Sequence, residues 1–175
     1  MTLLDISPVE KWIDLEKEIN KRSNLNASVF DAEGIRITDF KKWANRLCPV
    51  VKADEKGQSY ICAVAHQNAA GQARKAGQSA IVECDAGLVK VVVPIIVNGE
   101  FLGVAGGCGL LQKDGEVDTF LVNKTTDLGV GEIESLSEDI ETISMEKLKS
   151  VIKYIEEEID WIRRNYQNQR MVSAA

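Results

Sequence analysis

Four cysteines and one histidine are the side chains of this 175-residue sequence with the greatest capacity for chemistry. The cysteines are Cys48, Cys62, Cys84 and Cys108, and the histidine is His66. Cys62 and His66 lie one helical turn apart in a stretch with helical spacing, so both side chains project from one face of the helix. Sulfur and imidazole ligands that converge on one pocket would hold zinc or an iron–sulfur cluster. The four cysteines are therefore candidate ligands of a metal or cluster cofactor.

A structural role is the alternative for the same cysteines. The sequence contains no Cys-x-x-Cys pair, and free cysteine commonly packs in a core like a small hydrophobic residue. His66 is either a ligand or general base, or an ordinary residue on the exposed side of a helix. A cysteine nucleophile needs a partner histidine held by a third group. The single histidine allows only one such pair, with no known nucleophile motif around it, so we predict that the protein is not an enzyme.

Four further residues are candidates for contact with a bound molecule. Asp85 either accepts a hydrogen bond from a ligand or forms a turn with the residues that follow it. Trp43 and Tyr60 are either walls of an apolar pocket or ordinary core residues. Gly106 lies in a glycine-rich stretch, and glycine in a strand marks a bulge or a place where another group approaches the backbone closely.

Composition and charge exclude several classes of protein. The sequence is 45% hydrophobic and 27% charged, as in globular proteins, and its length suits one domain. A formal net charge of -6 and the lack of a basic stretch argue against binding to nucleic acid. The longest apolar run, residues 88–97, is much shorter than the roughly 20 residues of a membrane span. The N-terminus does not resemble a signal peptide, so we expect a cytoplasmic protein with reduced thiols.

The order of elements predicts an α+β fold in three parts. Residues 1–24 form an N-terminal helix, with Ser7 as its cap. Residues 25–143 form the core, and residues 144–175 contain a long C-terminal helix. Inside the core we expect a hairpin in residues 25–38, an alanine-rich helix in 59–75, a strand in 80–84, and short helices in 119–128 and 133–139.

The strongest local signal in the chain is a second hairpin. Asn98 and Gly99 stand between two apolar runs, residues 88–97 and 101–111. Asn-Gly in this position favours a type I′ turn, which joins antiparallel strands.

The predicted C-terminal helix carries an apolar stripe. Its members are spaced alternately by four and three residues, which is the a/d pattern of a coiled coil: Leu148, Ile152, Ile155, Ile159, Ile162 and Tyr166. Because only about three heptads are present, packing of the helix on its own sheet explains the stripe as well as a homodimer does. Both interpretations stay open.

The block from Leu47 to Leu111 resembles the PocR sensory domain, a PAS-like ligand-binding module of bacterial and archaeal signalling proteins. The similarity lies in Leu47-Cys48, Cys62, Lys75-Ala76-Gly77, Cys84-Asp85-Ala86-Gly87-Leu88, Val93-Pro94-Ile95, Asn98-Gly99-Glu100-Phe101-Leu102-Gly103 and Gly106-Gly107. It implies a PAS-like antiparallel sheet flanked by helices. Asp85 and Cys108 depart from the family, which commonly has histidine and glutamine at these positions.

The resemblance also implies a function. Family members usually precede an output domain and are thought to sense small organic compounds such as hydrocarbon derivatives. Because this chain ends soon after its last helix, the resemblance implies a signal passed in trans to a signalling protein. We expect the ligand between the small-residue helix and the glycine-rich sheet face. The candidate ligand-binding residues are Trp43, Cys48, Tyr60, Cys62, Cys84, Asp85, Gly106 and Cys108.

Overall fold

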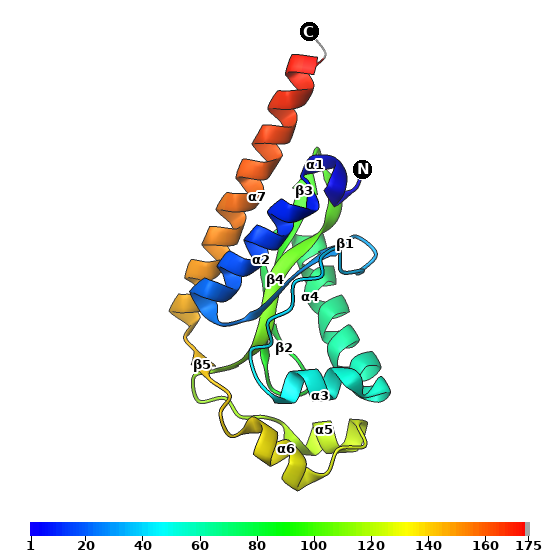
Figure 1. Ribbon diagram of the computed structural model, residues 1–175, viewed down its shortest axis with the longest axis vertical. Coiled ribbons are helices and arrows are strands. Elements are labelled where there is room, and N and C mark those ends of the chain that lie inside the picture. Colours follow the sequence, from blue (N-terminus) through cyan, green and yellow to red (C-terminus); the bar gives the residue numbers. More distant parts are fainter. Residues whose placement is uncertain (174–175) are drawn as a thin grey trace.

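The computed structural model describes residues 1–173 as an α+β domain, which confirms the predicted fold class (Figure 1). Its helices are α1 (Leu3–Ile6), α2 (Val9–Ser23), α3 (Leu47–Ala53), the π-helix η1 (Gly57–Cys62), α4 (Ala63–Ala76), α5 (Thr119–Thr125), α6 (Val130–Ser137) and α7 (Met145–Ser173). Its strands are β1 (Asn26–Asp31), β2 (Ala80–Glu83), β3 (Val89–Val97), β4 (Glu100–Gln112) and β5 (Thr142–Ile143).

The sheet has the strand order β1-β4-β3-β2, with antiparallel pairing throughout these four strands. The short β5 pairs in parallel with the end of β4. The predicted Asn-Gly hairpin joins β3 and β4, and both turn residues have the positive φ angles that a type I′ turn requires, 52° at Asn98 and 80° at Gly99. This turn therefore sets the register of the two central strands.

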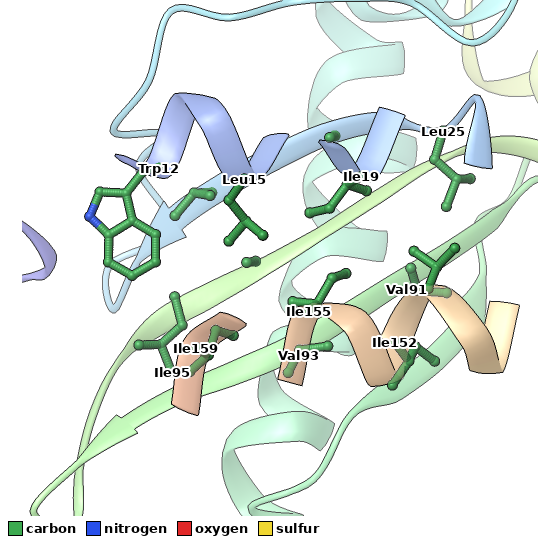
Figure 2. Close-up of a cluster of buried hydrophobic side chains, with 14 of the residues drawn as sticks. Trp12, Leu15, Ile19, Leu25, Val91, Val93, Ile95, Ile152, Ile155 and Ile159 are labelled. Atoms are coloured by element: carbon green, nitrogen blue, oxygen red, sulfur yellow. The ribbon is translucent and has the colours of Figure 1, made fainter. Parts of the chain in front are cut away.

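Helices cover both faces of the sheet because side chains alternate along each strand. One face packs against α2 and α7 in the largest core cluster, which includes Val91, Val93 and Ile155 (Figure 2). The opposite face packs against α4, where Ala69 and Ala73 are completely buried. Small side chains on α4 let this helix lie close to the sheet.

The apolar stripe of α7 packs on its own sheet. Its members Leu148, Ile152, Ile155, Ile159 and Ile162 are between 0% and 8% exposed in the single chain. This contact satisfies the a/d pattern within one molecule, so the stripe is not free to form a coiled-coil seam with a second copy. Of the two interpretations of the stripe, the structure agrees with packing of the helix on its own sheet.

The first predicted hairpin is only partly present. β1 forms as expected, but its return arm makes a single bridge, from Phe30 to Arg36, and then continues without regular structure. Arg36 turns inward to an ion pair with Glu16 on α2, at 3.2 Å, and this contact replaces a second strand. Three further elements, α1, α3 and β5, were not predicted.

Candidate functional site

A cavity of about 200 Å³ lies between the α4 face of the sheet and the helices η1 and α4. The segment that follows β1 and the start of α3 close its sides. The lining residues come from all these elements: Asn26, Ser28, Phe30, Glu33, Gly34, Arg36, Trp43, Cys48, Lys52, Gln58, Ile61, Cys62, Ala63, Ala65, His66, Gln67, Cys84, Leu88, Lys90, Cys108 and Gly109. The exposed residues Glu33 and Lys52 are at its solvent side.

The floor of the cavity is a row of side chains across three strands. Cys108 on β4 pairs with Asn26 on β1 and with Lys90 on β3. All three residues line the cavity, because paired residues in neighbouring strands point to the same face of a sheet. The row therefore presents an amide, a thiol and an amine side by side.

A bulge in β4 shapes the end of this row. The register between β3 and β4 shifts after the pair of Val89 with Leu110, so that Gly109 is the extra residue, with φ at 106°. A Cβ atom here would come within 2.9 Å of the Ala44 Cβ. The carbonyl oxygen of Gly109 accepts a hydrogen bond from the Asn45 amide, at 2.5 Å. Glycine thus lets the sheet approach the segment that leads into α3.

The roof begins with the π-helix η1, a form that is rare and frequent at functional sites. Gln58, Ile61 and Cys62 of η1, together with His66 of α4, line the cavity. The His66 ring lies 4.1 Å from the Phe30 ring, measured between centroids. The roof thus combines apolar surface with two polar side chains.

A buried ion pair fixes the side wall. Glu16 is 0% exposed and accepts hydrogen bonds from the Val29 backbone, from Arg36 and from Thr38. Arg36 also donates to the carbonyl oxygens of Ala27 and Phe40. The charge of Arg36 is therefore balanced inside the protein, although this side chain lines the cavity.

Several buried polar atoms in the cavity have no partner in the protein. Within residues 1–173, four buried side-chain polar atoms lack a hydrogen bond, and three of them belong to cavity residues: Asn26 Oδ1, Gln58 Oε1 and His66 Nδ1. Lys90 is 7% exposed and makes no ion pair among the described residues, and its amine lies 5.8 Å from the centre of the Phe30 ring. Because unpaired buried polar groups are costly, a polar partner inside the cavity would be favourable for these atoms.

A family model described as the sensory domain found in PocR matches residues 5–164. The chain belongs to the PocR sensory domain family. A search of curated proteins finds no match. As a member of the PocR family the chain is a ligand-sensing signalling domain, and the predicted resemblance is confirmed over most of the sequence. Within residues 1–173 of this PocR domain, no helix is both long and apolar enough to cross a membrane.

Five of the eight predicted ligand-binding residues line the cavity of this PocR domain: Trp43, Cys48, Cys62, Cys84 and Cys108. The other three lie elsewhere. The Tyr60 side chain points outward, with 63% of its surface exposed, and Asp85 is an exposed turn residue. Gly106 lies inside the sheet, where a Cβ atom would come within 1.9 Å of the Val91 carbonyl oxygen. A role in binding stays a prediction for all eight residues.

The four cysteines gather around the cavity as free thiols. Burial raises the pKa of Cys48 and Cys84, and it raises the pKa of Cys62 to about 11. Burial and the nearby Lys90 lower the pKa of His66 to about 4. Cys62 and His66 are thus both neutral near pH 7, which is the opposite of an activated thiolate–imidazolium pair.

The arrangement of the cysteines does not support the predicted metal or iron–sulfur site. In the described part of the chain, no group of three or more cysteine, histidine, aspartate or glutamate side chains is placed to hold a metal ion. Instead, Cys48, Cys62 and Cys84 pack against an apolar cluster around Leu47, Ile61 and Leu88. A metal or cluster role for the cysteines stays a prediction.

Sequence reasoning missed the residues that make the cavity polar. Asn26, Gln58 and Lys90 were not among the candidates, although one of them carries a visible signal. Lys90 is the only charged residue in the apolar run of residues 88–97, and lysine is almost never fully buried without a partner. A lone lysine in a buried strand is thus a sign of a site.

Proposed function

We propose that this domain binds a small organic molecule reversibly in the cavity, without covalent change, and reports the occupancy to a signalling protein in trans. The observation that carries the proposal is the set of buried polar atoms without a partner around one cavity. The volume of about 200 Å³ supports it, because benzene fits an apolar cavity of about 150 Å³. A ligand the size of a substituted benzene ring would fit.

The sheet provides a direct route for the signal. Lys90 faces the cavity, whereas its neighbours on β3, Val89 and Val91, face the core that includes α7. Figure 2 shows Val91 and Val93 near Ile152 and Ile155 of α7. A ligand that moves β3 would therefore move α7. Trp161, which is 47% exposed on α7, is a candidate contact for the partner or for a second copy in a homodimer.

The free cysteines support a cytoplasmic location for this protein. All four are free thiols, including three that are mostly buried beside the cavity. Reduced thiols persist in the cytoplasm. We propose this location together with the binding function.

A cavity-filling variant tests the binding function. Ala65 on α4 is 7% exposed and lines the cavity, so Ala65→Phe would place a ring in the space for the ligand. Gln72→Phe on the exposed side of α4 is the matched control. Thermal unfolding and native mass spectrometry are measured with a panel of diols, alcohols and aromatic acids. We expect a stabilising ligand for the wild type and Gln72→Phe, and none for Ala65→Phe.

Two results would overturn the proposal. The first is that no member of the panel stabilises the wild type and no ligand copurifies with it. The second is that Ala65→Phe, while folded, binds as tightly as Gln72→Phe. Sedimentation with and without the ligand then tests self-association, and a monomer at high protein concentration in both states would rule out the homodimer.

A further inference from the structure

Lys90 gives the cavity a positive charge that has no counterion within residues 1–173. Among the described residues, the cavity is lined by the cations Arg36, Lys52 and Lys90 and by one acidic residue, Glu33. Arg36 is paired with the buried Glu16, whereas Lys52 and Glu33 are exposed on the solvent side. Lys90 is thus left as the buried cation, at 7% exposure.

A hydrogen-bond acceptor lies on the other side of the same floor, and a second one lies in the roof. Asn26 pairs with Cys108, which in turn pairs with Lys90, so that Asn26 and Lys90 are two strands apart. The separation of their strands is about 10 Å, from two inter-strand spacings. The unpartnered oxygens, Asn26 Oδ1 on the floor and Gln58 Oε1 in the roof, accept hydrogen bonds and do not donate them. A ligand that lies along the floor therefore meets a cation at one end and the Asn26 acceptor at the other.

Part of the cavity lining is apolar. Phe30, Ile61 and Leu88 line the cavity, and the Cys108 thiol lies between Asn26 and Lys90 on the floor. A free thiol behaves as a small hydrophobic group. This surface suits a flat or aliphatic body between two polar ends.

We infer that the ligand is a small organic carboxylate whose negative group binds Lys90 and whose far end donates a hydrogen bond to Asn26. The inference rests on the proposed function and names the chemical class of its ligand. The carboxylate supplies the missing counterion, and a hydroxyl group supplies the donor that the amide oxygen lacks. An apolar body the size of one ring separates the two groups.

Calorimetric titration with matched probes tests the inference. The probes are 4-hydroxybenzoate, 4-hydroxybenzyl alcohol, which lacks the charge, and benzoate, which lacks the donor. We expect 4-hydroxybenzoate to bind most tightly and each of the other two to bind roughly tenfold or more weakly, since charged and buried hydrogen bonds are lost.

Variants locate the two contacts. Lys90→Met removes the charge but keeps an unbranched side chain. It should weaken the binding of both carboxylates by roughly tenfold or more and leave the binding of the alcohol unchanged. Asn26→Leu should remove the preference for 4-hydroxybenzoate over benzoate. Lys113→Met, at an exposed loop position, is the control and should bind like the wild type. Circular dichroism checks that each variant is folded.

Different outcomes separate this inference from the proposed function. If alcohols or diols bind and are blocked by Ala65→Phe, while no carboxylate binds more tightly than its uncharged match, the inference is wrong and the proposed function stands. Equal loss of both probe types in Lys90→Met would also overturn the inference. So would binding of inorganic phosphate in place of the organic acids. If no probe of either class binds the wild type, the proposed function fails as well.

Discussion

His66 makes the stability of this domain depend on pH in a predictable way. Burial, with Lys90 and Lys52 nearby, lowers the pKa of His66 from 6.5 to about 4. Between these values the unfolded chain binds a proton at His66 and the folded protein does not. The free energy of unfolding therefore contains a contribution that is complete above about pH 7 and is lost as the pH falls towards 4.

The size of the effect follows from the two pKa values. Between about pH 7 and about pH 5, the full shift corresponds to a loss of about 2 kcal/mol in the free energy of unfolding. Because the ring is only partly buried, solvent screening reduces this figure, and we expect a loss of about 1 kcal/mol. The sign follows from the excess of protons bound by the unfolded state.

Urea unfolding of the wild type and His66→Gln at several pH values measures this contribution. His66 is the only histidine in the chain, so the difference between the two stability curves isolates it from the carboxylates. Gln67→Ala, at the neighbouring exposed position, is the control and should follow the wild type. Parallel curves for the wild type and His66→Gln from about pH 5 to 7 would refute the assignment of a buried neutral ring.

Three other predictions concern the sheet, the side wall and the cavity. Gly106→Ala should lower the free energy of unfolding by about 2 kcal/mol or more, because its Cβ would meet the β3 backbone at 1.9 Å. Gly71→Ala, in open space on α4, should raise the free energy of unfolding by about 0.5–1 kcal/mol. Urea midpoints of both variants check this, and a stable Gly106→Ala would contradict the close strand contact. Glu16→Ala should lower the free energy of unfolding by about 3–5 kcal/mol, because it leaves Arg36 buried and unpaired. Adding Arg36→Met should restore part of this loss in the same assay, and no restoration would argue against the ion pair. Ligand binding should change tryptophan emission in the wild type and not in Trp43→Phe, because Trp43 alone among the three tryptophans lines the cavity; an unchanged response in the variant would place the ligand elsewhere.

Local features of this protein were predictable because short-range physics controls them. Asn98 and Gly99 tolerate the positive φ angles of a type I′ turn, and the turn forms as predicted. The N-terminal helix ends at Ser23, followed by Asn24 in the left-handed conformation, close to the predicted end. The periodicity of residues 59–75 predicted a helix, and the chain forms one there, although its first turns are the π-helix η1.

The candidate site was only partly predictable. The cysteines were visible as chemistry-bearing residues, and all four reach the cavity. Tyr60 and Asp85 do not, because helix rotation and turn direction depend on packing with distant elements. Asn26 and Gln58 have no signal in the sequence, since their burial without a partner depends on packing between elements that are far apart in the chain.

The sequence by itself determined the α+β class, the central hairpin, the long amphipathic C-terminal helix and the membership of the PocR family, because turn chemistry, periodicity and motif order are local properties. The tertiary structure decided what those elements do. It placed the α7 stripe on its own sheet in place of a coiled-coil seam, and it aligned Asn26, Cys108 and Lys90 in one row through strand register. Register and helix docking depend on contacts between residues far apart in the chain, and these contacts set both the cavity and its unpaired charge.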